Sequence, residues 1–421
     1  MSIDRREFLK LSASATGATL FASACSREKP EGSGPLSKLR PMTDGIVPIS
    51  DDERKARIEK AQRLMIQNKI DAIFIESGTN LFYYTGIQWG ASERMFALVL
   101  PARGDIAYVC PKFEEGRARE LIRFGVDVRT WEEDESPYKR VVQIFNDRGI
   151  ISGRIGIEER VRFFLFDGIR KETTGFECVS ADPVTVGCRV IKTPAEISLM
   201  QHANDITVVA YKTTLEMLRE GMTKEEFRAN STEAFKRLGV TGGIGANFGE
   251  ATAFPHGSIK ARTLREGDVV LMDGGCSVNG YRSDISRTIV FGKPAQRHRE
   301  IWNLEHEAQA AAFLAAKPGV LCEEVDAAAR KVITDAGFGP DYKLPGLPHR
   351  TGHGIGLDGH EWTYLVRGNK TPIKVGMCFT NEPMIVIPGE FGVRLEDDMY
   401  ITDEGAKFFT QPSPSIEQPF A

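Results

Sequence analysis

The sequence predicts an α/β protein with two domains, and three observations support this prediction. At 421 residues the chain is too long for one hydrophobic core of ordinary size. Residues 51–187 alternate β-rich runs with helical patterns, which is typical of an α/β domain. From residue 188 to 421 the pattern changes to long helices and strand hairpins, and none of the seven histidines occurs before residue 202. We therefore expect the second domain to carry the chemistry.

The first domain begins with a helical pattern at 51–68, "DDERKARIEKAQRLMIQN". A β-rich run follows at 71–77, and 96–111 is typical of two strands around the turn "ARGD". A helical pattern at 112–125 and a further strand pattern at 153–159 complete the alternation. Because this domain contains no histidine, we do not expect it to supply the main chemistry.

The second domain opens with helical patterns whose starts carry recognisable caps. Thr193 suits an N-cap and Pro194 suits the first helical position. Thr223 and Glu226 have the spacing of a capping box. The helical patterns cover 193–221, 223–239 and 297–316.

The N-terminus is typical of an export signal. "DRREFLK" (4–10) is followed by a mildly apolar run and then small residues up to residue 25, which is too weak a pattern for a spanning helix. Arg5 and Arg6, followed by "EFLK", resemble the twin-arginine signal, whose pathway exports folded proteins. A Sec signal with an incidental arginine pair is the alternative. Either way, we expect the protein to be exported to the periplasm.

The end of this signal, residues 1–25, also resembles a lipoprotein processing site. "ASAC" (22–25) offers Cys25 for acylation, although Ala22 stands where leucine is usual. Cys25 either carries a lipid anchor or lies near a plain cleavage site, and the sequence leaves both open. The segment 26–50 is rich in Gly, Pro, Ser and charge at its start, so we expect a flexible linker there.

Composition narrows the function classes. A hydrophobic content of 41% and a charged content of 27% are ordinary for a soluble globular protein. A net charge of −4 without a basic stripe gives no indication of a nucleic-acid partner. The cysteines after Cys25 show no CxxC spacing, so we expect most of them to be buried small hydrophobes rather than zinc ligands.

The first predicted hairpin, 267–290, brings two carboxylates together. Two β-rich runs flank the turn "SVNG". If residues 278 and 279 form its tip, Asp273 lies directly opposite Asp284, and if the tip is one residue later they are diagonal neighbours. Both registers place them on the same face of the hairpin. Carboxylates that close repel each other unless a cation lies between them.

The second predicted hairpin, 375–402, repeats the arrangement. Glu382 and Glu396 are equidistant from Gly389 in the turn "PGEFG", so they lie opposite each other. One such pair alone would be read as incidental. Two pairs together with the glycine-flanked His353 suit a two-metal hydrolytic centre with ions about 3.5–4 Å apart. Oxygen-rich ligation favours Mn²⁺, while one imidazole leaves Co²⁺, Fe²⁺ and Zn²⁺ open.

Four strings in this half resemble the metallopeptidase family of proline dipeptidase, Xaa-Pro aminopeptidase and methionine aminopeptidase. The resemblance covers about residues 190–405, and 51–187 is similar to the creatinase-type N-terminal domain of the proline-directed branch. It implies a pita-bread α/β fold for the second domain. The strings are "DGGCSVNGYRSDISRT" (273–288), "HRTGHGIGLDGHE" (349–361), "NEP" (381–383) and "VRLEDD" (393–398).

The resemblance implies a role for individual residues. Asp284 and Glu396 would bridge two divalent metal ions, Asp273 would bind one of them, and His353 with Glu382 would bind the other. All five ligand positions of the family pattern are therefore present.

Other family positions lie beside these ligands. His360 and His256 would contact the scissile carbonyl or the tetrahedral intermediate, or else orient neighbouring groups. Arg394 would fix Glu396 or a substrate carboxylate, with a plain salt bridge as the alternative. His349 either supports a ligand or belongs to the core. We assign no role to the remaining histidines, His202, His298 and His306.

The implied reaction is hydrolysis of the Xaa–Pro bond by a metallopeptidase, with Glu382 passing a proton to the leaving proline nitrogen. The resemblance also implies a homodimer. The sequence leaves dipeptide and longer substrates equally open. Two alternatives remain: a creatinase-like hydrolase of a small-molecule amide, and a catalytically silent module that binds peptides or proteins.

Overall fold

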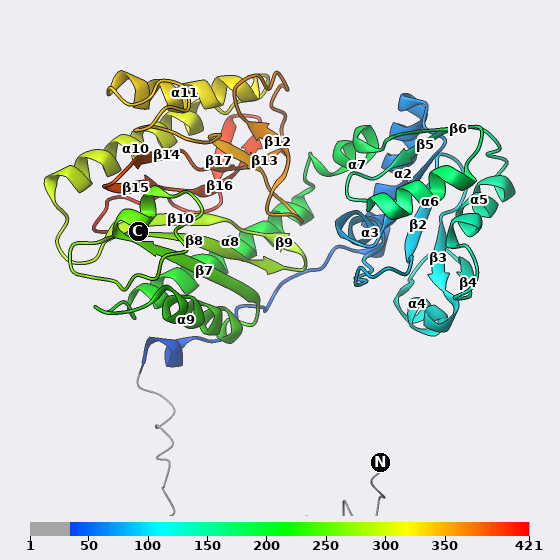
Figure 1. The fold of residues 1–421 in the computed structure, drawn as a ribbon, viewed down its shortest axis with the longest axis horizontal. Helices are drawn as coiled ribbons and strands as arrows, with labels where there is room; N and C mark the ends of the chain where they lie inside the picture. The colour runs from blue at the N-terminus through cyan, green and yellow to red at the C-terminus, as the bar shows by residue number, and fades with distance from the viewer. Residues whose placement is uncertain (1–33, 421) are drawn as a thin grey trace, which may run out of the picture.

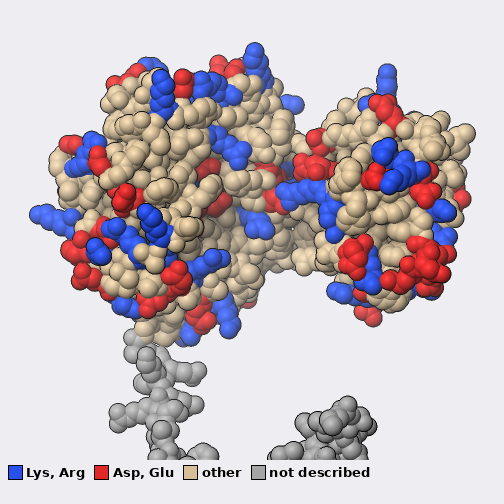
Figure 2. All heavy atoms as spheres, viewed as in Figure 1, with Lys and Arg blue, Asp and Glu red and all other residues tan. Residues whose placement is uncertain are grey.

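The protein forms two lobes in the computed structural model, which describes residues 34–420 (Figure 1). The predicted export signal at 1–25, with Cys25, and residues 26–33 of the predicted linker lie outside the described residues. Within residues 34–420 no helix is long and apolar enough to cross a membrane. On the face shown in Figure 2, acidic and basic side chains are interspersed, and both kinds gather where the two lobes meet.

A six-stranded mixed sheet forms the first domain, in the order β4-β3-β2-β1-β5-β6. β2 runs antiparallel to both of its neighbours, and the other neighbouring pairs are parallel. The strands are β1 (Ala72–Glu76), β2 (Ala97–Pro101), β3 (Ala107–Pro111), β4 (Asp127–Trp131), β5 (Gly153–Ile157) and β6 (Phe176–Ser180).

Helices cover both faces of this sheet, which explains why β1 and β2 are buried along their whole length. Ile73 and Ile75 belong to the core on one face, and Phe74 belongs to the core on the other. The helices are α2 (Asp51–Asn68), α3 (Thr79–Thr85), α4 (Glu115–Leu121, after the 3₁₀ turn η2 at Lys112–Glu114), α5 (Pro137–Asp147), α6 (Phe163–Glu172) and α7 (Asp182–Arg189).

The second domain places its sheets between two pairs of helices (Figure 1). α8 (Pro194–Leu215) and α9 (Lys224–Arg237) lie on one side, and α10 (Gln296–Ala315) and α11 (Cys322–Asp335) lie on the other. The predicted caps are confirmed, because Thr193 and Thr223 each accept a hydrogen bond from the backbone N–H three residues later. This arrangement is the pita-bread fold that the motif strings imply.

Three sheets make up the interior of this domain. One has the order β10-β8-β7 with β9 beside β8, the next has the order β12-β11-β13-β16-β17, and the third pairs β14 with β15. The strands are β7 (Thr241–Phe248, followed by the 3₁₀ turn η3 at Gly249–Ala253), β8 (Val269–Val278), β9 (Tyr281–Arg282), β10 (Ile285–Val290), β11 (Gly352–Gly354), β12 (Glu361–Leu365), β13 (Cys378–Asn381), β14 (Met384–Ile387), β15 (Phe391–Arg394), β16 (Asp397–Thr402) and β17 (Gly405–Phe408).

The described part of the predicted linker, residues 34–50, is packed chain rather than a free tether. It opens with the 3₁₀ turn η1 (Pro35–Lys38), and the Met42 N–H donates to the Leu238 carbonyl at 3.0 Å. Leu36 and Ile46 pack against the core. The segment carries enough apolar side chains to bind along the second domain, and composition alone did not reveal this.

The six cysteines among the described residues are unpaired. All of them except Cys178 are buried, which agrees with the expectation that most are small core hydrophobes.

Candidate metal centre

The hairpin of β8 and β10 carries Asp273 and Asp284 on one face. Val278 pairs with Tyr281, so Asn279 and Gly280 form the tip, and both have positive φ. Asp273 then pairs with Ser286. The two acids are therefore diagonal neighbours, which is the second of the two predicted registers.

The second hairpin has the predicted register along its whole length. Met384 pairs with Arg394 in the outer ladder, and Asn381 pairs with Asp397 in the inner one. Glu382 and Glu396 occupy the gap between these ladders and lie opposite each other. Glu382 is 9% exposed and Glu396 is 2% exposed, so both carboxylates are held in the interior.

His353 reaches the carboxylates because glycines let its strand lie close to the next one. A Cβ on Gly352 would lie 2.1 Å from the Thr380 carbonyl oxygen. The His353 N–H donates to Thr380 Oγ1 at 3.1 Å, and its Nδ1 is 3.0 Å from the Gly354 carbonyl oxygen. Nδ1 must carry the proton to make that bond, so the lone pair of Nε2 is free for a metal. Nε2 lies 3.2 Å from Glu382 Oε1.

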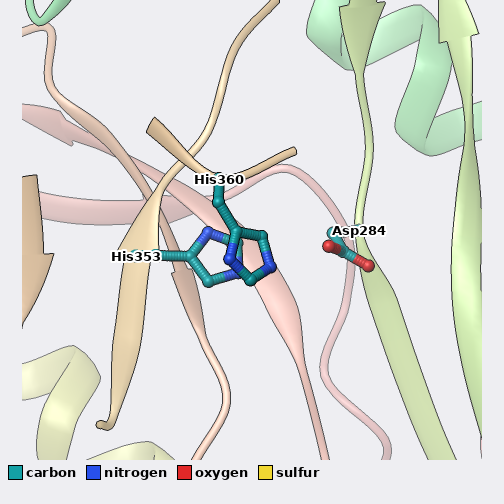
Figure 3. A group of neighbouring side chains, drawn as sticks. All are labelled: Asp284, His353 and His360. Atoms are coloured by element: carbon teal, nitrogen blue, oxygen red, sulfur yellow. The ribbon is translucent and has the colours of Figure 1, made fainter. Parts of the chain in front are cut away.

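The five ligand candidates converge in overlapping groups. In each group the possible ligand atoms lie within 4.8 Å of one another. Figure 3 shows Asp284 facing the stacked rings of His353 and His360. A donor set of four carboxylates and one imidazole fits hard or borderline divalent ions. The groups are Asp284 with His353 and His360, His353 with Glu382 and Glu396, and Asp273 with Asp284 and Glu396.

The pKa shifts of the ligand candidates also indicate a cation site. Burial raises the pKa of Asp284 and of Glu396 well above the usual range of a carboxyl, and the neighbouring carboxylates add to the rise. Burial also raises the pKa of Glu382, although Arg394 opposes that rise. Burial and then His360 lower the pKa of His353 to about 3, which keeps its imidazole neutral. A cluster of this kind is stable in its ionised form only with added positive charge.

Arg394 supplies part of that charge and fixes one side of the centre. Its Nη2 lies 2.6 Å from Asp273 Oδ2, and its Nε donates to Ser286 Oγ at 3.0 Å. The Ser286 hydroxyl lies 2.6 Å from Glu396 Oε2. Arg394 is 5% exposed, whereas the side chain of Asp273 is 45% exposed, so this ion pair lies at the edge of the interior. Arg394 is placed to orient Asp273 directly and Glu396 through Ser286.

His360 lies at the open side of the centre. Its ring stacks on that of His353 at 3.8 Å between centroids. Arg350 Nη2 donates to His360 Nδ1 at 3.0 Å, which leaves the proton of a neutral ring on Nε2. Burial and then the Arg350 charge lower the pKa of His360. A neutral imidazole with a free N–H suits a hydrogen-bond donor to substrate.

His256 lies farther from the ligands than the other site residues. It is exposed and lines a pocket of about 390 Å³ that also borders Asp273 and Arg394. The pocket continues from the metal centre toward Lys224 at the start of α9. His256 can therefore reach a substrate that extends out of the centre, but it is not a ligand candidate.

The remaining histidines lie outside the ligand groups. His349 Nδ1 is 2.7 Å from the Arg350 carbonyl oxygen, and its buried Nε2 lacks a hydrogen-bond partner among the described residues. His306 stacks on Trp302, and His298 contacts the edge of Phe391.

Several supporting residues were not identified from the sequence. Ser286 could have been found, because it lies opposite Asp273 in one of the two possible registers. Arg350 belongs to a motif string but carries no signal of its own. Asp398 accepts the Asp284 N–H at 3.0 Å from another hairpin, a contact that no local pattern predicts.

Comparisons with known proteins agree with this geometry. Two family models match the chain: metallopeptidase family M24 over residues 198–403, and the creatinase/prolidase N-terminal domain over residues 57–191. An uncharacterized peptidase of Schizosaccharomyces pombe is 36% identical over 86% of this chain and 82% of its own length. The Xaa-Pro dipeptidase of Pyrococcus furiosus is 32% identical over 85% of this chain and 98% of its own.

A solved structure shows the same arrangement of both domains. The recombinant prolidase from Thermococcus sibiricus matches with a TM-score of 0.78 at 31% identity, over 85% of this chain and 97% of that one. The protein described here thus belongs to metallopeptidase family M24. It is a peptidase of two domains, in which a creatinase/prolidase-type N-terminal domain precedes the catalytic domain. The predicted fold class and family are confirmed.

Proposed function

We propose that the protein is a dinuclear metal-dependent peptidase that hydrolyses the Xaa–Pro bond, in dipeptides or at the N-terminus of longer peptides. The observation that carries the proposal is the convergence of five ligand candidates in overlapping groups that share Asp284, His353 and Glu396. The names of two relatives, a Xaa-Pro dipeptidase and a prolidase, support the substrate class.

Asp284 and Glu396 would bridge two divalent ions, because each belongs to two of the three groups and, unlike the imidazole of His353, offers two oxygen atoms as ligands. Asp273 would complete one ion's ligands, and His353 with Glu382 would complete those of the other. Mn²⁺ fits the oxygen-rich donor set best, and Co²⁺, Fe²⁺ or Zn²⁺ would also fit. Bound there, the ions supply Lewis acidity and make water nucleophilic at neutral pH.

Glu382 would move the proton. The nitrogen of the scissile Xaa–Pro amide is the proline ring nitrogen, which carries no hydrogen, so proline leaves only after that nitrogen gains a proton. Glu382 lies on the inner face of the centre, where Thr380 Oγ1 donates to its Oε1 at 3.3 Å. In the metal-free protein, burial raises the pKa of Glu382.

His360 and His256 would bind the oxygen of the scissile carbonyl. Arg350 donates to Nδ1 of His360, so the Nε2–H of His360 is free to donate to substrate. A neutral donor aimed at the developing negative charge lowers the barrier of the attack. Arg394 would hold Asp273 and Ser286 in place during the reaction.

Hydrolysis of a Xaa-Pro dipeptide and a Xaa-Pro-Yaa tripeptide, with and without added Mn²⁺, tests the proposal. Metal-dependent cleavage of either peptide supports it, and the choice between them assigns the dipeptidase or the aminopeptidase activity. An Asp284→Ala variant that folds normally should lose the activity. Metal binding without cleavage of either peptide would redirect the search to small-molecule amides, as in a creatinase-like enzyme. A folded protein that binds no metal would be a silent binding module.

We also propose that the protein is exported to the periplasm, from the twin-arginine-like residues Arg5 and Arg6. Fractionation of cells that express the full chain tests this, because changing both arginines to lysine should retain the protein in the cytoplasm. A Cys25→Ser variant separates the two forms of export: only a lipid-anchored protein would move from the detergent phase to the aqueous phase. A homodimer, which the family resemblance implies, is testable by light scattering.

A further inference from the structure

The loop that carries His360 is anchored on one side by the catalytic domain. This loop, residues 355–361 between β11 and β12, is called the His360 loop below. The Ile355 N–H donates to the Cys378 carbonyl at 3.2 Å, and the Arg282 N–H donates to the Gly356 carbonyl at 2.8 Å. Both contacts lie at the start of the loop, and at its far end Glu361 pairs with Gly354 in the β11–β12 ladder.

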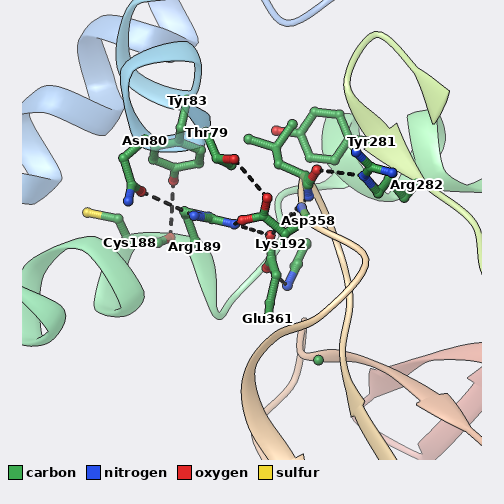
Figure 4. A network of polar contacts seen from close by, with 12 residues as sticks. Thr79, Asn80, Tyr83, Cys188, Arg189, Lys192, Tyr281, Arg282, Asp358 and Glu361 are labelled. Atoms are coloured by element: carbon green, nitrogen blue, oxygen red, sulfur yellow. Dashed lines mark hydrogen bonds and ion pairs between the residues drawn. The ribbon is translucent and has the colours of Figure 1, made fainter. Parts of the chain in front are cut away.

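Asp358, two residues before His360, is held from the other side. Thr79 Oγ1 donates to Asp358 Oδ1 at 2.7 Å, and Arg160 Nη1 donates to the same oxygen at 2.9 Å. Arg189 Nη2 donates to Oδ2 at 2.6 Å. Thr79 and Arg160 belong to the first domain, and Arg189 is the last residue of α7. Figure 4 shows Thr79 and Arg189 converging on Asp358.

Glu361, the residue after His360, completes the arrangement. Its Oε1 accepts the N–H groups of Leu357 and Asp358 at 3.0 and 3.2 Å, so the carboxylate closes the loop on itself. Arg189 donates to the same oxygen, and Lys192 Nζ donates to Oε2 at 2.9 Å (Figure 4). His360 thus lies between two carboxylates that both share Arg189.

Polar contacts hold the His360 loop on the side that faces the first domain, because the loop lacks tight packing there. A cavity of about 180 Å³ separates the two domains there, and its lining includes Arg160, Asp358, His360 and Trp362. Acidic and basic side chains also gather at this junction in Figure 2. A shift of the first domain would therefore pull on Asp358 through these polar contacts.

We propose that the first domain positions His360 for catalysis by holding the carboxylate of Asp358. The positioning residues are Thr79, Arg160 and Arg189. The inference rests on the proposed function, in which His360 contacts substrate. The metal ligands come from β8, β11, the residue before β10 and the 375–402 hairpin, so loss of this contact would displace His360 and leave metal binding intact.

Arg160→Ala tests the inference, because the Arg160 side chain is 51% exposed and its removal should not prevent folding. We expect kcat to fall on the order of tenfold, as for other residues that orient a catalytic group, with unchanged metal affinity. Arg160→Lys should restore most of the activity. Arg170→Ala is the matched control: Arg170 lies in the same domain, is 57% exposed and pairs with Asp167.

A double-mutant cycle shows whether Arg160 acts through His360. In a His360→Ala background, Arg160→Ala should have no further effect on kcat. Additive losses in the two variants would overturn the inference. A change in KM alone, without a change in kcat, would also overturn it.

Hydrogen–deuterium exchange of residues 355–361 separates failure of this inference from failure of the proposed function. The amides of Leu357 and Asp358 should exchange faster in Arg160→Ala and Thr79→Val than in wild type or Arg170→Ala. Faster exchange in a protein that cleaves no Xaa-Pro peptide would support the domain contact and reject the proposed substrate. Unchanged exchange would overturn the inference whatever the substrate.

Discussion

Ser286 and Glu396 are joined by a reciprocal pair of backbone hydrogen bonds. The Ser286 N–H donates to the Glu396 carbonyl at 3.2 Å, and the Glu396 N–H donates to the Ser286 carbonyl at 3.1 Å. This isolated bridge connects the two hairpins that carry the four acidic ligands. The relative position of the carboxylates is therefore set by the backbone and does not depend on side-chain contacts alone.

The Ser286 hydroxyl should affect metal affinity more than stability. It receives the Arg394 Nε–H and contacts Glu396 Oε2 at 2.6 Å. Removing it in Ser286→Ala leaves the backbone bridge but frees the Glu396 carboxylate. We expect a metal dissociation constant about tenfold higher, within the range known for groups that support metal ligands. Titration calorimetry with Mn²⁺ measures it, and Ser277→Ala on the same hairpin is the control. Equal affinities of the two variants would contradict the assigned role.

Metal binding should stabilise the protein more at pH 8 than at pH 5.5. In the metal-free protein, burial and neighbouring carboxylates raise the pKa of Asp284 and Glu396. Unfolding releases their protons, so the metal-free fold becomes less stable as pH rises through the interval between the unfolded and folded pKa values. The metal binds the deprotonated carboxylates and removes this penalty. Melting temperatures with Mn²⁺ and with EDTA at both pH values measure the difference, and a gap that is independent of pH would contradict the expectation.

Glu361 should contribute to stability above pH 4.5 and lose this contribution in acid. Burial alone would raise its pKa, but Arg189 and Lys192 outweigh burial and lower it to about 2. Because the folded pKa is below the unfolded value, the contribution is complete above the unfolded pKa and declines as pH falls toward 2. The difference of more than two units corresponds to about 3 kcal/mol.

Urea unfolding of wild type and Glu361→Gln at pH 6, 5, 4 and 3 measures this contribution. The gap in unfolding free energy between the two proteins should be about equal at pH 6 and pH 5 and should narrow from pH 4 to pH 3. A gap that stays constant over this range would show that Arg189 and Lys192 do not lower the pKa of Glu361.

Gly352→Ala should destabilise the protein strongly. The new Cβ would lie 2.1 Å from the Thr380 carbonyl oxygen, so the strand that carries His353 must move away from the strand next to Glu382. We expect a loss of about 3 kcal/mol or more in unfolding free energy, together with weaker metal binding. Gly116→Ala is the control, because Gly116 lies in α4 with open space around its Cα and alanine favours a helix. A Gly352→Ala variant as stable as Gly116→Ala would contradict the expectation.

The parts of the fold that follow local rules could be predicted from the sequence. The helix at 51–68 coincides with α2, and the strand pairs around both turns have a predicted register. Hairpin register depends on turn residues and on alternation, so Asp273, Asp284, Glu382 and Glu396 could be placed before the structure.

Other elements depended on tertiary contacts. The predicted helix at 193–221 ends at Leu215 in the structure, where the chain turns toward α9. The short α3 was not predicted, although its first residue, Thr79, contacts Asp358. We did not expect the first domain to supply the main chemistry, but its side chains reach the His360 loop. Contacts between residues almost three hundred positions apart leave no periodic trace in a sequence.

The packing of residues 34–50 also determines which of the two lobes lies nearer to anything attached at the N-terminus. The chain enters at η1, beside α9 of the catalytic domain, crosses to the first domain at α2, and returns at α8 (Figure 1). An attachment upstream of Gly34 would therefore pull on the catalytic domain and leave the first domain as the distal lobe. The η1 segment contacts α8 and α9, so a pull on the N-terminus would act on the catalytic domain before it reached the junction that holds His360.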